Sequence, residues 1–483
     1  MTVAHEQGIT PSRSLLKPDI LEICSLLVVT VLVGYRLFVY PAMGMADNGD
    51  FSRFLTRPGL EHATIDEPFY YFNPTYRITT PAQEDDGYRS STELFVRAAR
   101  GLSLAFVDKE FFDIRVLGAI YLALFLLAIY LALLATRRMR MRVRAPIALA
   151  TVFLLTDAGY IAYFNTFYSE PTAMVSLLLA LGCALLIISR QLSSWALLVG
   201  YFAASAILIT AKPMCVVFAL PLALFGVYLS GRISLRRRFV AGISLACALC
   251  ILAVWYQAQS PQWLRRNANY IAIFQDLLPN SKTPEQDLDG LGLDFFWIKY
   301  TGVGPYGAGP MSSASLRTDF EQRIHTATIA KFYLERPARL FDLLRRCASH
   351  TLITRIEHLG YYTKESGKPF KSQPPGPWSE IRDSVFPKNI WMLGGFIIVG
   401  TVIAVVGSIK HAAHRYWYAA LGTLVVIAAL QFVVPVLAVG EPDVERHLFL
   451  YSLVFDIILI SLVALLFAVP YKALFRKLRR RQL

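Results

Sequence analysis

The chain has 483 residues, of which 55% are hydrophobic and 17% are charged, with a net charge of +14. Soluble domains usually carry about 25% charged residues, so the composition excludes an ordinary soluble domain and indicates an integral membrane protein. The positive charge does not predict nucleic-acid binding, because the basic residues cluster between long apolar segments, at 137–144, 232–238 and 472–481.

About ten apolar segments approach or exceed the roughly 20 residues that a helix needs to cross a bilayer. Helix is the expected state, because lipid offers no hydrogen-bond partners to the backbone. The fold class we predict is therefore an all-α integral membrane protein with about ten transmembrane helices. The predicted spans are 20–43, 115–136, 145–164, 171–189, 193–211, 213–230, 239–258, 390–408, 416–438 and 448–469.

The charges between the spans predict how the chain is oriented. If the N-terminus is cytoplasmic, every loop on that side carries Lys or Arg, which agrees with the positive-inside rule. Both termini are then cytoplasmic, and the two large loops, 44–114 and 259–389, are extracytoplasmic. The cytoplasmic segments are 137–144, 190–192, 231–238, 409–415 and the basic tail from residue 470.

This orientation divides the chain into three regions. Residues 1–258 form an N-terminal transmembrane module, 259–389 a large extracytoplasmic region, and 390–483 the last helices with the basic tail. Within the loops, the apolar stripe at 92–107 predicts a helix that lies on the membrane surface. Residues 318–356 are also predicted to be helical.

Two carboxylates, Asp47 and Asp50, directly follow the first apolar segment. Ionised groups at the edge of hydrocarbon are costly unless a polar cavity receives them, so they suggest a functional site. There a carboxylate could accept a proton from an attacking hydroxyl. The alternative is a solvated turn that caps a helix starting near Phe51.

A second polar stretch, Tyr163 to Pro171, joins two spans on the same predicted side. Glu170 could reach the same cavity as Asp47 or Asp50, and Asn165, Tyr168 and Ser169 would add hydrogen-bonding groups for a sugar. Alternatively, Glu170 merely interacts with the helix dipole beside Pro171.

Two cationic positions complete the pattern. Lys212 lies alone at an outer turn, where it either extends to the interface or binds a phosphate. Arg446 and His447 open the last span, and an arginine there suits a bidentate phosphate contact. The alternative for Arg446 is pairing with nearby acids. Those acids are Glu441, Asp443 and Glu445.

Two further acids lie inside spans. Asp157 and Asp456 either pair within the helix bundle or line a wet cavity.

The arrangement resembles the GT-C superfamily of multi-span glycosyltransferases. In that superfamily an acid in the first exterior loop is the candidate base, and a second acid lies in the next exterior loop. Asp47 and Asp50 match the first position, and Glu170 matches the second. The segments 47–53 and 165–170 are similar to those of bacterial glycan-biosynthesis hexosyltransferases of the WsfD type. The resemblance covers the whole chain in topology and these short segments in motif.

The resemblance implies a membrane glycosyltransferase of the bacterial inner membrane with an extracytoplasmic active site. It would move a sugar from a polyprenyl-phosphate donor to a glycan or lipid-linked acceptor, and its other partners would be membrane lipids. Either Asp47 or Asp50 would be the base, and a requirement for a divalent cation stays open. The implied catalytic residues are Asp47, Asp50 and Glu170, and the implied substrate-binding residues are Asn48, Arg53, Asn165, Tyr168, Lys212, Arg446 and His447.

Two other functions are compatible with a multi-span protein of this kind. A transporter or flippase of lipid-linked glycans would show charges deep in several spans and pseudo-repeats. The sequence has few such charges and no visible repeat. A glycan polymerase or ligase of another membrane fold would place its main loop and key arginines differently.

Overall fold

The computed structural model describes residues 17–63, 69–82, 89–189, 194–233, 236–307, 309–442 and 444–468. Over these residues, eight helical spans are long and apolar enough to cross a membrane, or nine if one bent pair counts as a span. The predicted all-α membrane fold is thereby confirmed. The eight are α1 (Ile20–Phe38), α4 (Arg115–Ala135), α7 (Glu170–Ser189), η3 with α9 (Pro213–Phe218 and Ala219–Ser230), α10 (Arg236–Ala258), α17 (Ile390–Lys410), α18 (Arg415–Val439) and α20 (Phe449–Ala468).

The other two predicted spans depart from a single long helix. The span predicted at 145–164 consists of α5 (Met141–Leu155), then α6 (Ala158–Ile161) with η2 (Ala162–Asn165), bent by 56°. Asp157 lies at the bend, where its carboxylate accepts a hydrogen bond from the Gly159 N–H at 2.9 Å and so caps α6. The span predicted at 193–211 is α8 (Trp195–Ala211), which at 17 residues is shorter than each of the eight spans named above.

The predicted break at Lys212 and Pro213 is confirmed. Lys212 has an extended backbone (φ −153°, ψ 142°), and Pro213 is the first residue of η3. Proline disfavours a helical conformation in the residue before it, and its missing N–H is tolerated at the start of a helix. The chain therefore turns sharply at Lys212.

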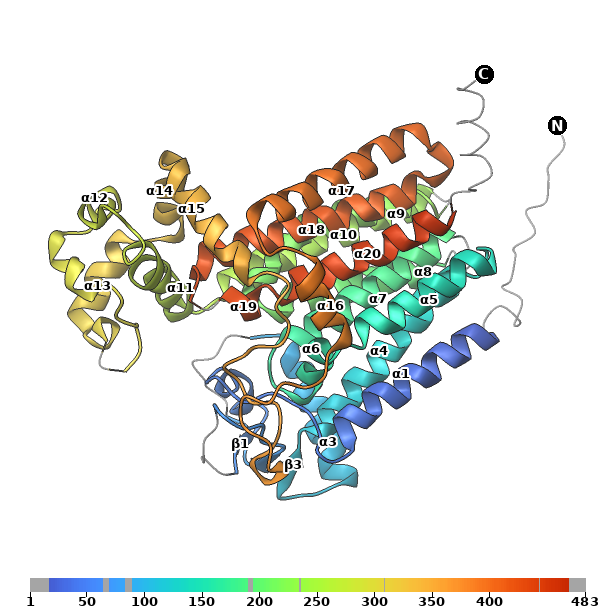
Figure 1. Ribbon diagram of the computed structural model, residues 1–483, viewed down its shortest axis with the longest axis horizontal. Coiled ribbons are helices and arrows are strands. Elements are labelled where there is room, and N and C mark those ends of the chain that lie inside the picture. Colours follow the sequence, from blue (N-terminus) through green and yellow to red (C-terminus); the bar gives the residue numbers. More distant parts are fainter. Residues whose placement is uncertain are drawn as a thin grey trace.

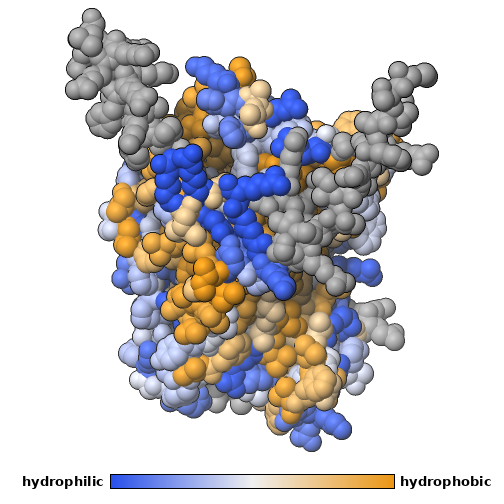
Figure 2. Space-filling view, turned by 90° about the vertical axis from the view of Figure 1, so that its right-hand side faces the viewer, coloured by the Kyte–Doolittle hydropathy of each residue, from blue (hydrophilic) through white to orange (hydrophobic). Residues whose placement is uncertain are grey.

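The helices form one bundle with two different ends. Figure 1 shows α1 beginning and α20 ending at the same end, while the two long connecting segments lie at the other, which we call the loop end. Figure 2 looks onto the end opposite the loop end, where hydrophilic surface gathers between hydrophobic flanks. Arg138, Arg140 and Arg142 are exposed in the connection there. The predicted loop at 190–192, the tail from residue 470 and Asp443 lie outside the described residues.

Helices from the first and last predicted regions pack together. α20 packs against α5, and α18 packs against α9. On the surface of the bundle α17 leaves apolar side chains exposed, among them Ile398 (64%) and Ile409 (76%). Such a surface is what lipid covers in a membrane protein.

The first long segment carries a small sheet that the sequence analysis did not predict. Its strands β1 (Leu60–His62), β2 (Thr75–Ile78) and β3 (Phe111–Asp113) are antiparallel in the order β1-β2-β3, and Tyr76 pairs with both His62 and Phe112. Strands of three or four residues are too short to show alternation. The helix predicted at 92–107 is confirmed as α3 (Thr92–Phe106), with Val96 and Ala99 buried and Phe106 82% exposed.

The second long segment is a series of short helices, which Figure 1 shows grouped at the loop end. The single helix predicted at 318–356 is wrong. The chain leaves the helical conformation at Ile324 and His325, and again at Arg336, which precedes Pro337. The elements are α11 (Gln262–Tyr270), η4 (Ile271–Leu277), α12 (Pro284–Gly290), η5 (Phe295–Tyr300), η6 (Pro310–Ser312), α13 (Ala314–Arg323), α14 (Thr326–Glu335), α15 (Pro337–Cys347), η7 (Ala348–His350), η8 (Lys364–Ser366) and α16 (Pro377–Val385).

Two buried acids fix α16 to the bundle. Asp157 accepts hydrogen bonds from the backbone N–H groups of Trp378 and Ser379, both at 3.1 Å. Asp456 pairs with Arg382 at 2.9 Å, and both side chains are fully buried. Asp157 and Asp456 therefore pair within the protein, which decides between the two alternatives for these residues.

Candidate functional site

Asp47 shapes the turn that follows α1. Its Oδ1 accepts hydrogen bonds from the N–H groups of Gly49 at 2.7 Å and Phe51 at 3.1 Å. Gly49 has a φ of 98°, a left-handed conformation that a side chain would disfavour. The other oxygen of Asp47 lies 3.2 Å from His62 Nε2. One oxygen of this carboxylate thus holds the turn before α2 (Ser52–Leu55), which has no side-chain cap, and the other oxygen faces an imidazole.

Asp50 lies between two arginines. Its Oδ1 is 2.7 Å from Arg53 Nη2, and its Oδ2 accepts a hydrogen bond from Arg446 Nη2. Arg446 belongs to α19 (Val444–His447), 396 positions further along the chain, and is only 6% exposed. Arg53 also lies over the Trp263 ring, 5.6 Å from its centroid. The structure thus brings together the first long segment and α19, which are far apart in the sequence, around one carboxylate.

Tyr168 contacts both Arg446 and the first long segment. The Arg446 guanidinium lies over its ring, 4.6 Å from the centroid. The hydroxyl donates to the Ala46 carbonyl at 2.9 Å and accepts from the Asn48 N–H at 3.0 Å. Burial raises the pKa of Tyr168 well above its ordinary value, so the hydroxyl stays protonated. Tyr168 therefore fixes the first loop and Arg446 relative to each other.

Asn165 is fully buried and holds the exit of α1. Its amide nitrogen donates to the carbonyls of Met43 at 2.8 Å and Leu37 at 3.1 Å. A side chain at Gly118 would collide with the amide oxygen. In this position Asn165 orients the segment that leads to Asp47, and its predicted contact with a sugar stays a prediction.

A second polar group forms where α7, the Lys212 turn and α19 meet. Lys212 Nζ lies 2.9 Å from Glu170 Oε1 and 2.6 Å from His447 Nδ1. The His447 carbonyl accepts a hydrogen bond from Gln431 Nε2 at 2.6 Å. Glu170 and His447 are 4% and 8% exposed. Glu170 thus partly balances the charge of Lys212. The same ammonium group contacts His447, the residue that follows Arg446.

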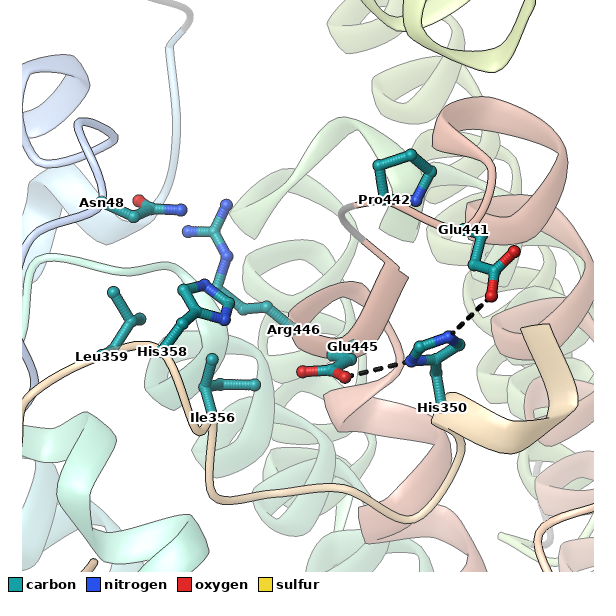
Figure 3. Close-up of a pocket in the computed structure, with 9 residues that line it drawn as sticks. All are labelled: Asn48, His350, Ile356, His358, Leu359, Glu441, Pro442, Glu445 and Arg446. Carbon is teal, nitrogen blue, oxygen red and sulfur yellow. Dashed lines mark hydrogen bonds and ion pairs between the residues drawn. The ribbon is translucent and has the colours of Figure 1, made fainter. Parts of the chain in front are cut away.

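A cavity of about 220 Å³ opens beside the Asp50–Arg446 pair. Figure 3 shows Asn48, His358 and Arg446 on one side of it, Glu441, Pro442 and His350 on the other, and Glu445 between them. Asn48 and Arg446 are the predicted site residues in its lining, whereas Asp47, Asp50 and Glu170 are not among its lining residues. Its lining residues are Asn48, His350, Ile356, His358, Leu359, Glu441, Pro442, Glu445 and Arg446.

His350 connects the second long segment to the start of the last span. Its Nδ1 lies 3.0 Å from Glu445 Oε1, and its Nε2 lies 3.2 Å from Glu441 Oε1. With a carboxylate at each nitrogen, both nitrogens act as donors only in the protonated imidazolium. The hydrogen bond to Glu445 and, to a smaller extent, the one to Glu441 raise the pKa of His350. The hydrogen bond between His350 and Glu445 also lowers the pKa of Glu445.

Glu441 is held in place by its backbone and by Arg346. The preceding residue, Gly440, has a φ of 65°, and a Cβ there would lie 2.6 Å from the Cβ of Asp276. Arg346 bonds both Glu441 at 3.2 Å and Asp276 at 2.9 Å. The far wall of the cavity is therefore a fixed network of charges.

The His350 contacts predict a pH-dependent link between η7 and α19. The raised pKa of His350 means that its stabilising contribution is present below the unfolded pKa of about 6.5 and is lost as the pH rises through the folded value. We expect backbone hydrogen exchange at 444–447 to quicken severalfold, beyond the intrinsic rate, between about pH 6 and about pH 9. His350→Gln should show little of this change. An unchanged pH profile in that variant would contradict the assignment.

His350, His358 and His62 were not predicted from the sequence. Each comes from a polar loop or a short element, and no spacing connects it to the acids that it faces. The available signal was weaker: His350 and His358 lie in a segment predicted to be on the same side of the membrane as Glu441. Among the described residues no three His, Cys, Asp or Glu side chains lie close enough together to bind a metal ion. A requirement for a divalent cation stays a hypothesis.

The fold and the site define a multi-span membrane protein with a polar cavity at the loop end. A family model described as the YfdI N-terminal transmembrane domain matches residues 9–482. The chain therefore belongs to this family. No curated protein and no solved structure shows significant similarity to it. The closer likeness to the WsfD type stays a prediction.

Proposed function

We propose that the protein is a GT-C-type glycosyltransferase that moves a sugar from a polyprenyl-phosphate donor to a glycan or lipid-linked acceptor. The observation that carries the proposal is the pairing of Asp50 with Arg446 at the edge of a cavity. A base for an acceptor hydroxyl and a cation for a phosphate are the two groups that this transfer needs, and here they are in contact. The reaction would take place at the loop end, on the extracytoplasmic face.

Of the two candidate bases, Asp50 fits better than Asp47. One oxygen of Asp47 is engaged by two backbone N–H groups, which hold the turn. Both oxygens of Asp50 contact side chains, Arg53 and Arg446, rather than backbone groups, and these side chains would exchange partners when substrate binds. Asp50 would take the proton of the acceptor hydroxyl as the hydroxyl oxygen attacks the anomeric carbon. The bond from that carbon to the phosphate oxygen breaks, and direct displacement inverts the configuration.

Two cations would stabilise the departing lipid phosphate. The guanidinium of Arg446 has five N–H donors, enough to keep one contact with Asp50 while it bonds a phosphate oxygen. Lys212 would contribute its charge from the adjacent turn, where Glu170 and His447 fix its ammonium group. Charge that develops on the leaving group would then meet positioned donors, which is often the largest catalytic contribution.

The direct test uses purified protein in detergent with undecaprenyl-phosphate hexose, radiolabelled in the sugar, and lipid-linked glycans extracted from bacterial envelopes. We expect release of undecaprenyl phosphate together with transfer of label to the glycan fraction. Retention of all label on the donor would contradict the proposal. Donor binding without release would instead fit the transporter or flippase hypothesis.

A further inference from the structure

The walls of the cavity differ in charge. On one side Arg446 is engaged with Asp50 and Tyr168. Across the cavity lies Glu441, and Glu445 lies between the two sides; His350 joins the two carboxylates. Glu441 and Glu445 both line the cavity, so a ligand that enters beside Arg446 shares it with two carboxylates.

The lining is also amphipathic. Ile356 and Leu359, both nearly fully buried, and Pro442 give it apolar surface, while Asn48 and His358 add polar groups. The volume of about 220 Å³ is below the roughly 300–1,000 Å³ of pockets for drug-sized ligands, which favours one ring-sized unit. A pyranose ring presents C–H faces and hydroxyl edges, and so matches a lining of this kind.

The two carboxylates select the charge of that unit. An ionised carboxylate only accepts hydrogen bonds and has about four lone-pair positions, more than one imidazole fills. Sugar hydroxyls can donate to the remaining positions in charge-assisted hydrogen bonds. A phosphate or carboxylate group on the ring would meet like charge, which is a common source of specificity. An ammonium group would compete with charges that His350 and Arg346 already balance.

We propose that this cavity is a subsite for an uncharged pyranose ring of the acceptor, whose hydroxyls donate to Glu441 and Glu445. The assignment to the acceptor rests on the proposed transferase function, whereas the binding of a neutral ring does not. Asn48 and Arg446 would place the bound ring next to Asp50. Glu441 and Glu445 are then specificity-determining residues of the reaction.

The test measures binding without turnover. Saturation-transfer NMR of the full chain in detergent, with no donor present, would use methyl glucoside, galactoside and mannoside at millimolar concentrations. Glucose 6-phosphate and glucosamine serve as charged probes. We expect at least one neutral hexoside to bind and the charged sugars to bind more weakly. Glu441→Gln and Glu445→Gln should each weaken that binding roughly tenfold, because a charge-assisted hydrogen bond becomes a neutral one.

Glu380→Gln is the matched control. Glu380 is an exposed carboxylate on α16 that pairs with Arg355 and lies outside the cavity lining. This control variant should bind like the wild type and keep the wild-type melting temperature. Glu441→Gln and Glu445→Gln should lower the melting temperature only slightly, because each amide keeps an oxygen that accepts a hydrogen bond from His350. The subsite is overturned if no neutral hexoside binds, if a charged sugar binds at least as tightly, or if the glutamine variants bind normally. Displacement of the hexoside by undecaprenyl-phosphate hexose would overturn the assignment to the acceptor. Hexoside binding without any sugar transfer would leave the subsite standing and count against the transferase alone.

Discussion

Replacing Asp50 by asparagine is expected to lower the rate of sugar transfer by about 100- to 10,000-fold. The amide has nearly the same size as the carboxylate and can still accept a hydrogen bond from Arg446, but it cannot take a proton from the acceptor hydroxyl. The interaction that is lost belongs to the transition state, so kcat should fall while KM for the donor changes little. Initial rates of undecaprenyl-phosphate release at several donor concentrations would measure both constants.

Two comparison variants separate this role from a general loss of charge. Asp113→Asn removes another arginine-paired carboxylate from the same long segment, because Asp113 on β3 lies 2.5 Å from Arg115, and it should keep nearly full activity. Asp47→Asn keeps an oxygen that can accept from the Gly49 and Phe51 N–H groups, so we expect a smaller loss than for Asp50→Asn. A larger loss for Asp47→Asn, with Asp50→Asn active, would make Asp47 the base.

Hydropathy predicts the bundle because each span is a local property of the sequence. A stretch such as 171–189 must be helical in lipid whatever its neighbours are, and α7 begins within one residue of that prediction. Hydropathy does not predict the bend at Asp157. At that bend the carboxylate accepts hydrogen bonds from Trp378 and Ser379, which are more than 200 positions away.

The candidate site was predictable in its residue types but not in its pairings. Position at the end of a span identified Asp50 and Arg446 separately. Their contact depends on how α19 approaches the first loop, and no spacing within either segment specifies that approach. The histidines were harder to predict from the sequence, because the role of His350 depends on its contacts with Glu441 and Glu445. Charge at span ends thus predicts where a site forms, and packing decides which groups meet.

The second large effect concerns stability rather than chemistry. Asp456→Ala is expected to lower the free energy of unfolding by about 3–5 kcal/mol, because it leaves the fully buried Arg382 without its partner. The same carboxylate accepts hydrogen bonds from Tyr160 at 2.6 Å and from the Trp378 indole at 2.8 Å, so the substitution also leaves two buried donors unsatisfied. The melting temperature of the detergent-solubilised protein and denaturant titration would measure the loss.

The loss should be concentrated where α16 meets the bundle. Since Asp456 and Asp157 hold Arg382, Trp378 and Ser379, hydrogen exchange across Pro377–Val385 should rise more than exchange in α4 or α7. Asp383→Ala is the control on α16, because Asp383 is 38% exposed and pairs with Lys388 at the surface. This substitution should change the free energy of unfolding by less than about 1 kcal/mol. Asp456→Asn should lie between the two, because it keeps an acceptor for Tyr160 or Trp378 but leaves the charge of Arg382 unbalanced. Equal stability of Asp456→Ala and Asp383→Ala would mean that the buried pair does not hold α16. In that case packing of the α16 side chains, rather than charge, fixes the end of the second long segment to the bundle.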